Sequence, residues 1–161
     1  MSLKELIEEL KKHPGVAKQK LKVKLAKVSS FKINVKAGKF KLVFDEEQII
    51  GGSNEGPTPA HMLLASIGGC FLSTLQVWSQ ILDISINSAE VIVKGTIDAL
   101  GMTGIDESAP IGFQNLTAEF KIESDEPAEK VKQLLDAAVE HCPVHHTIKS
   151  QTEINISLKE K

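Results

Sequence analysis

The sequence predicts an α+β fold, and three patterns carry this prediction. Apolar residues alternate as in β-strands over residues 21–44, and they do so again at 89–93, 116–122 and 154–158. A long apolar helix over 59–82 follows the first strands, and an amphipathic helix after Pro127 precedes the last strand. Strands and helices gathered in blocks, without regular βαβ alternation, are typical of α+β proteins.

The N-terminal residues predict an additional short helix. Apolar residues follow helical spacing over residues 3–10, Ser2 and Glu5 fit a capping box, and the helix should end near His13. Acidic residues interrupt this segment, which excludes the pattern of a secretory signal peptide. We therefore expect a cytoplasmic protein with reduced cysteines. We also expect a single domain over residues 1–161, in which residues 1–15 form an extra helix.

Positive charge is concentrated at the N-terminal end of the sequence. Residues 1–41 contain 12 Lys and 3 Glu, whereas the remaining residues contain 7 Lys and 18 acidic residues. Lysines alternate with apolar residues at 20–25, without the interleaved aromatic residues of single-strand nucleic-acid binders. We therefore expect the solvated face of a sheet, with lysines that also protect its edge, and no nucleic-acid partner.

The long helix is the most informative element. Thr58 fits an N-cap and Pro59 the first helical position, and no Asp, Glu or Lys occurs between Glu55 and Asp83. This uncharged segment is long enough to cross a membrane as a helix. However, small and polar residues form one stripe at helical spacing, so we expect a helix buried by protein, with one face on a pocket or a partner helix, and no membrane. The stripe consists of Ser66, Gly69, Ser73, Gln76 and Gln80.

Two cysteines lie beside breaks in the helices. Cys70 follows Gly68 and Gly69 in the long helix and borders the polar stripe, and Cys142 follows the second helix and precedes Pro143. Each cysteine alone is consistent with a buried, unreactive side chain. In a reducing compartment, however, a pair of thiols in such places suggests an attacking and a resolving cysteine.

The motifs around both cysteines resemble those of the OsmC/Ohr family. The sequence Gly-Pro-Thr-Pro at 56–59 leads through Leu-Leu-Ala-Ser-Ile-Gly-Gly to Cys70, and Cys-Pro-Val at 142–144 resembles the family's second signature. The order of elements agrees over residues 18–158. This resemblance implies an OsmC-like fold, in which antiparallel sheets wrap around a long central helix in an intertwined homodimer.

The resemblance also implies a chemistry. Family peroxidases attack small hydrophobic organic hydroperoxides with the first cysteine, which becomes a sulfenic acid. The second cysteine then closes a disulfide, which an external dithiol reduces. Carried over to this sequence, Cys70 is the peroxidatic and Cys142 the resolving cysteine, with no cofactor and no metal. A thiol peroxidase, or organic hydroperoxide reductase, is therefore the first functional hypothesis.

Two departures from the family pattern predict weak activity. Family peroxidases hold the thiolate with an Arg, and this sequence has none; they also carry a Glu where Ala60 stands. Because a free cysteine has a pKa of about 8.5, a thiolate at Cys70 needs a cation supplied by Lys or His. The candidate supporting residues are His61, His145, His146, Ser66 and Ser73.

Two other functions stay open on the sequence alone. The two cysteines and one of the C-terminal histidines can converge on a zinc ion. His61 cannot share a metal with Cys70, because a separation of nine residues along one helix places them about 13–14 Å apart along its axis. Alternatively, a non-catalytic protein can keep the family pocket and bind a small molecule, with the loop 101–112 as its lid.

Overall fold

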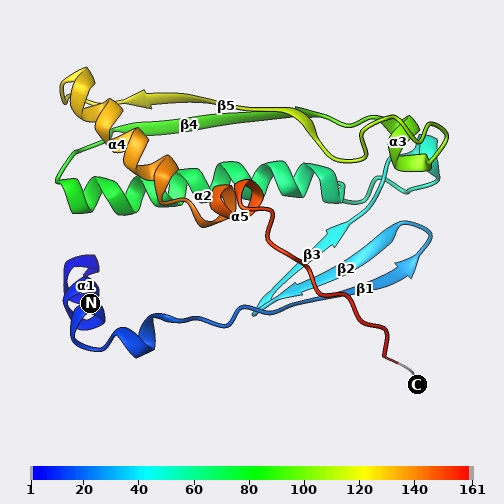
Figure 1. Cartoon of the computed structure of the whole chain (residues 1–161), viewed down its shortest axis with the longest axis horizontal. Coiled ribbons are helices and arrows are strands. Elements are labelled where there is room, and N and C mark those ends of the chain that lie inside the picture. The colour runs from blue at the N-terminus through cyan, green and yellow to red at the C-terminus, as the bar shows by residue number, and fades with distance from the viewer. Residues whose placement is uncertain (1, 160–161) are drawn as a thin grey trace. The chain divides into compact units, whose positions relative to one another are not determined.

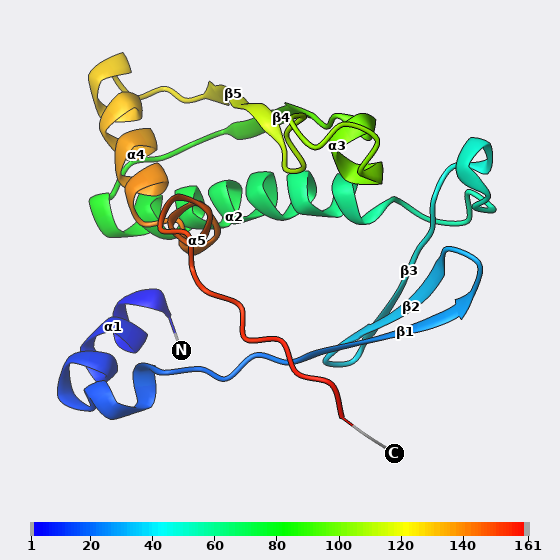
Figure 2. The ribbon, with the colours of Figure 1, turned by 45° about the vertical axis from the view of Figure 1, so that its right-hand side comes forward.

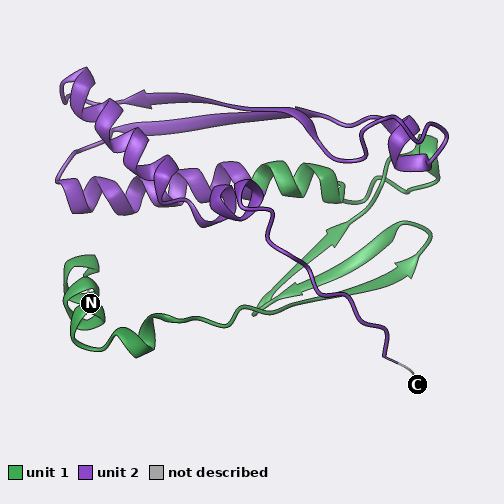
Figure 3. Cartoon of the chain, viewed as in Figure 1, with its two compact units in different colours: residues 1–65 green, residues 66–161 purple. Residues whose placement is uncertain are grey.

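The computed structural model describes residues 2–159 and separates the chain into two compact units, with the division between Ala65 and Ser66 (Figure 3). Each unit combines helix with antiparallel strands. This confirms the predicted α+β class. The single domain over residues 1–161 stays a prediction.

The first unit begins with helix α1, Leu3–Lys12, and the 3-10 turn η1, Pro14–Ala17. The predicted capping box is present: the Glu5 backbone N–H donates to Ser2 Oγ over 3.3 Å, and the Ser2 N–H donates to the Glu5 carboxylate over 2.7 Å. His13 ends the helix, as predicted. No residue of α1 is buried in the single chain.

The first unit continues with a three-stranded antiparallel sheet in the order β1-β2-β3. Leu25, Val35 and Leu42 lie directly opposite one another and form part of its apolar face. A turn follows Ala37, and Gly38 adopts a φ of 58° there, which favours glycine. The strands are β1 Val23–Ser29, β2 Lys32–Ala37 and β3 Phe40–Phe44.

A buried carboxylate organises the segment after β3, which includes the 3-10 turn η2, Gln48–Ile50. Asp45 is only 1% exposed and accepts backbone N–H groups of Glu46 (2.8 Å), Ser53 (3.1 Å) and Glu55 (3.2 Å). Burial acts to raise its pKa, but the N–H groups and a nearby lysine lower it more, so the pKa lies below its ordinary value of 3.8. Asp45 thereby closes the loop that leads to the long helix.

The second unit contains most of the long helix and all later elements. Its strands β4 and β5 pair antiparallel, and Figures 1 and 2 show this hairpin running along α2. Its core cluster consists of Leu75, Ile84, Leu134 and Ala138. The elements are α2 Pro59–Leu82, β4 Ser88–Thr96, α3 Ala99–Thr103, β5 Gln114–Glu123, α4 Ala128–Glu140 and α5 Pro143–Lys149.

The two adjacent glycines of α2 lie on different faces. A Cβ atom at Gly68 would lie 3.2 Å from methyl carbons of Val91 and Val93, inside the usual contact distance, so this glycine lets β4 approach the helix. A Cβ atom at Gly69 would meet nothing within 4 Å. The whole predicted stripe that contains Gly69 is exposed in the single chain.

By length and composition, α2 is the one helix in residues 2–159 that is apolar enough to cross a membrane. Only 28% of its most apolar window is buried. The same two criteria are met by core helices of soluble proteins, so they do not decide what covers α2. Large apolar side chains on it, including Leu63, Val77 and Ile81, are 38–42% exposed in the single chain.

The structure differs from the sequence prediction in three places. The prediction of a last strand is wrong for the single chain, because residues 152–159 form no strand. Three apolar side chains in this segment are highly exposed: Ile154 (80%), Ile156 (92%) and Leu158 (91%). A strand needs a neighbour for its backbone hydrogen bonds, and no described strand pairs with this segment. In addition, α3 lies where a loop was predicted, and α5 was not predicted at all.

Asp45 should make the stability of the protein depend on acidic pH. A carboxyl group with a lowered folded-state pKa stabilises the fold above its unfolded pKa, near 3.8, and this contribution is lost as the pH falls through the folded-state pKa. We expect Asp45→Asn to lower the thermal midpoint at neutral pH and to flatten the loss of stability in acid. Thermal unfolding followed by circular dichroism across this pH range measures both.

The matched control is Glu47→Gln, which changes an exposed acid in the same loop. It should leave the thermal midpoint at neutral pH and the loss of stability in acid unchanged. If Asp45→Asn lost stability in acid as steeply as the native protein does, this would contradict the role assigned to this carboxylate.

Candidate thiol site

The two cysteines occupy different environments in the second unit. Cys70 lies in the middle of α2 and is partly exposed, and its carbonyl accepts a hydrogen bond from Thr74 Oγ1 over 2.8 Å. Cys142 is fully buried, with 0% exposure. It is the N-cap residue of α5, Pro143 follows it at the first helical position, and its carbonyl accepts the N–H of His146 over 3.0 Å.

The structure brings the two thiols close together, and both are free. Burial raises the pKa of Cys142, and the neighbouring Cys70 side chain raises it further. The backbone N–H groups of His145 and Val144 oppose this rise in part, because they stabilise a negative sulfur. Cys142 is therefore held as a protonated thiol that can donate to the Cys70 sulfur.

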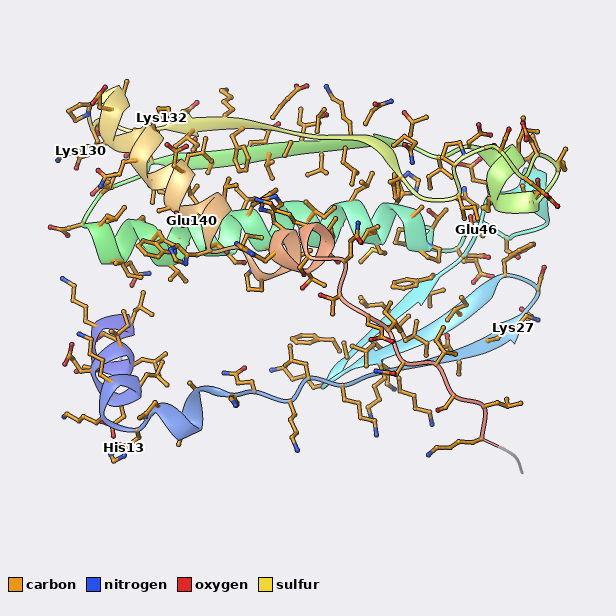
Figure 4. The ribbon with its side chains drawn as sticks, in the orientation of Figure 1. His13, Lys27, Glu46, Lys130, Lys132 and Glu140 are labelled. Atoms are coloured by element: carbon orange, nitrogen blue, oxygen red, sulfur yellow. The ribbon has the colours of Figure 1, made fainter. Side chains whose placement is uncertain are left out.

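The C-terminal histidines fix the turn between α4 and α5. His145 Nδ1 lies 3.2 Å from the carbonyl oxygen of Val139, and His146 Nε2 lies 2.5 Å from that of Glu140, which Figure 4 labels at the end of α4. In both cases the ring nitrogen donates to a backbone carbonyl in the last turn of α4. The His145 ring also packs against Phe71 at 5.7 Å between centroids. Both histidines therefore position Cys142 through the backbone.

The other predicted supporting residues lie along α2. His61 lies in the first turn of α2, where its backbone N–H donates to Thr58 Oγ1 over 3.1 Å and its Nδ1 lies 2.9 Å from the same oxygen. Ser66 and Ser73 lie on the exposed stripe of α2. Among the hydrogen bonds of residues 2–159, none joins a Lys or His side chain to either sulfur. A cation beside Cys70 thus stays a prediction.

Two features of the site were not predicted from the sequence. The Trp78 ring stacks on the His141 ring with centroids 4.4 Å apart and planes at 23°, which ties the residue before Cys142 to α2. The Phe71 ring meets Phe120 edge-to-face at 5.5 Å. The position of the single Trp at helical spacing from Cys70 was visible in the sequence, but its partner depends on how α4 packs.

An apolar cavity of about 350 Å³ opens beside Phe71, the residue that follows Cys70. Its three polar side chains are those of Thr117, His145 and Lys149. Such a mostly apolar lining with few polar groups suits a small hydrophobic ligand. The lining residues are Ile67, Phe71, Val93, Leu116, Thr117, Ala118, His145, Ile148 and Lys149.

The predicted alternative of a zinc site finds no support in the geometry. Residues 2–159 contain no group of three or more His, Cys, Asp or Glu side chains placed to hold a metal ion. One ring nitrogen of His145 and one of His146 are engaged with backbone carbonyls. Among the described residues, the two cysteines therefore have no third side chain placed to complete a metal site with them.

Comparison with known proteins defines the family. The sequence profile of the family described as OsmC-like protein matches residues 52–157, which include both cysteine motifs. This protein belongs to the OsmC-like family. It is 26% identical over 128 residues to a protein of Mycoplasma genitalium named hydroperoxide reductase, and the match covers 78% of this chain and 86% of that one.

Solved structures show the same fold. An OsmC-like protein from Mycoplasma pneumoniae superposes with a TM-score of 0.71 at 20% identity, covering 88% of this chain and 96% of the other. An organic hydroperoxide resistance protein OsmC from Legionella pneumophila gives a TM-score of 0.62 at 18% identity, covering 83% and 91%. The predicted OsmC-like fold, with antiparallel sheets and a long central helix, is thus confirmed.

The difference in burial between the two cysteines predicts an order of chemical labelling. Alkylation requires a thiolate that the reagent can reach. Because Cys142 is buried with a raised pKa, we expect iodoacetamide to label Cys70 at least roughly tenfold faster in the folded protein. Mass spectrometry of proteolytic peptides after timed labelling measures both rates. The unfolded protein, as the control, should label both at similar rates, and faster labelling of Cys142 in the folded protein would contradict this assignment.

Proposed function

We propose that this protein reduces organic hydroperoxides through a Cys70 sulfenic acid and a Cys70–Cys142 disulfide. The observation that carries the proposal is the contact between a partly exposed thiol and a buried, protonated one. Family membership and the hydroperoxide reductase of Mycoplasma genitalium support the same chemistry. Cys70 is the attacking residue because it is the thiol that a substrate can reach.

The proposed reaction has three steps. The Cys70 thiolate attacks the terminal oxygen of the hydroperoxide, the O–O bond breaks, and the departing alkoxide takes a proton to become an alcohol. The Cys142 sulfur then attacks the Cys70 sulfenic acid: the S–S bond forms, the S–O bond breaks, and the hydroxyl leaves with the thiol proton as water. An external dithiol finally returns both cysteines to thiols by exchange and is itself oxidised to a disulfide.

The cavity beside Phe71 supports a small hydrophobic hydroperoxide as the substrate. Its lining is mainly aliphatic and aromatic, so it favours the organic part of such a molecule over water-like peroxides. His145 and Lys149 at its edge supply the polar contacts. In this proposal the neighbouring Cys142 thiol donates a hydrogen bond to the attacking Cys70 sulfur, in a sequence that contains no Arg.

We further propose that the working form is an intertwined homodimer. The exposed stripe of α2 and the open space at Gly69 leave room for a second helix to pack closely. The apolar residues of 154–158 are exposed and without a strand partner among the described residues. Contact with a second copy would cover both regions, and it would account for an apolar helix that is so poorly buried in the single chain. Protein rather than lipid is then the cover for α2.

We expect slow but measurable turnover of an alkyl hydroperoxide with a dithiol. Loss of one charged hydrogen bond removes about 2–4 kcal/mol of transition-state stabilisation, so the missing Arg should leave turnover roughly two to three powers of ten below a complete family site. Steady-state consumption of cumene hydroperoxide measures it. Cys70→Ser should abolish turnover, whereas Cys142→Ser should stop after one equivalent and leave a sulfenic acid that dimedone traps.

Three results would contradict this account. Turnover at the rate of a complete family site would mean that another group replaces the Arg. Turnover unchanged by Cys70→Ser would remove this residue from the mechanism. No turnover at all would favour the alternative of a small-molecule binder that keeps the pocket.

Substitution at Gly69 tests the dimer. Because a side chain at this position meets nothing in the single chain, Gly69→Leu should fold, and its helical propensity improves by roughly 1 kcal/mol. In the dimer the same side chain should prevent the close approach of the partner. Sedimentation at micromolar concentration should show a dimer for the native protein and monomer for Gly69→Leu. Lys132→Leu, which places the same side chain on an exposed position of α4, is the control and should remain dimeric. A monomeric native protein would refute the proposal.

A further inference from the structure

Three lysines form a row across the sheet of the first unit. Lys24 of β1 lies directly opposite Lys36 of β2, and Lys36 lies directly opposite Lys41 of β3. Residues directly opposite one another in antiparallel strands project to the same face. With neighbouring strands about 4.7–4.9 Å apart, the row spans roughly 9–10 Å across the sheet.

No acidic group of the described chain neutralises this row. Residues 10–44 contain 11 Lys and no Asp or Glu. Of the lysines in this sheet, Lys32 is paired with Glu55 at 2.5 Å, whereas none of the ion pairs in residues 2–159 involves a lysine of the row. Like charges placed directly opposite on a sheet are destabilising. A bound anion would remove this repulsion.

The row lies in a hollow of the surface. A cavity of about 460 Å³ is lined by all three lysines. The next row on the same face consists of Ala26, Asn34 and Val43, in which the Asn34 amide adds a neutral hydrogen-bonding group. This face therefore presents a line of positive charge with neither an acidic nor an aromatic side chain in its two central rows.

We propose that the Lys24–Lys36–Lys41 row binds a linear oligophosphate chain. An ammonium group binds phosphate oxygens as a compact point charge with three donors. A linear anion with several charges along its length matches the length of this row better than a single phosphate does. The absence of aromatic side chains in these rows gives a nucleic-acid base nothing to stack on, so the phosphate chain alone is recognised. This site is separate from the cysteines and does not depend on the proposed peroxidase activity.

Calorimetric titration with tripolyphosphate tests the proposal at constant ionic strength. We expect tripolyphosphate to bind at least roughly tenfold more tightly than orthophosphate, because several charge-assisted contacts replace one. Lys36→Gln, which removes the central charge, should lower the affinity for tripolyphosphate at least roughly tenfold. The matched control is Lys27→Gln: this β1 residue, labelled in Figure 4, lies opposite Ile33 on the apolar face, and its loss should change the affinity less than about twofold.

ATP serves as a second probe for the source of the phosphate chain. Binding of ATP that is no tighter than that of tripolyphosphate would support recognition of the phosphate chain alone. Tighter binding of ATP would show that the nucleoside is also recognised, and it would overturn this part of the proposal. Equal weakening by Lys36→Gln and Lys27→Gln would show a diffuse positive field and overturn the proposal. An acidic peptide or duplex DNA that binds as tightly as tripolyphosphate would also overturn it.

The fold of the variant is checked by thermal unfolding without added anion. Lys36→Gln should unfold at the same or a higher temperature than the native protein, because it relieves repulsion between neighbouring lysines. If Lys36→Gln is instead unstable, Lys41→Gln at the end of the row takes its place in the titration, with the same expected loss of affinity. Tripolyphosphate should raise the thermal midpoint of the native protein, and no rise at saturating concentration would contradict binding to the folded state.

Discussion

The contact between the Cys70 and Cys142 thiols is the interaction on which the site depends. It requires that the middle of α2 and the turn between α4 and α5 meet at one point. Pro143 begins α5 directly after Cys142, and the two histidines that follow donate to the last carbonyls of α4. The turn is thereby held by the backbone, and Cys142 has little freedom to leave Cys70. Such a pre-formed pair suits a disulfide that must close soon after the first thiol is oxidised.

The same helix meets two different requirements on its two sides. At Gly68 the side chains of β4 come so close to α2 that a Cβ atom there would lie 3.2 Å from their methyl carbons, and this packs α2 against the hairpin. One residue later the surface is open, and the small and polar residues of the stripe continue along the helix. The apolar side chains flanking that stripe remain 38–42% exposed in the single chain. A second copy of the chain would cover both the open face of α2 and the exposed C-terminal residues. For this reason the dimer is part of the proposed function.

Local signals in the sequence predicted most of the elements. The capping box at Ser2, the alternation in 21–44, the N-cap at Thr58 and the charge-free run to Asp83 depend only on neighbouring residues, and the structure agrees with all of them. The strand expected at 154–158 did not form, because a strand depends on a neighbour as well as on its own pattern. The short α5 was not predicted, although Pro143 at its first position is a signal for it.

The site was predictable only in part. The two cysteine motifs identified the thiols, and the structure places these thiols together. The sequence could not show that His145 and His146 are engaged with α4 carbonyls, or that His141 stacks on Trp78, because these contacts arise from packing between distant segments. The lysine row is a similar case. Alternation predicted that the lysines share a face, but only the register of the strands places three of them in line.

The most direct test of the account is the product of a single oxidation. The reduced protein is treated with one equivalent of cumene hydroperoxide, quenched with an alkylating reagent, digested without reductant and analysed by mass spectrometry. The account predicts one disulfide, between Cys70 and Cys142 of the same chain, together with one equivalent of the alcohol. Recovery of both cysteines as alkylated thiols, or of Cys70 oxidised while Cys142 remains a free thiol, would contradict it.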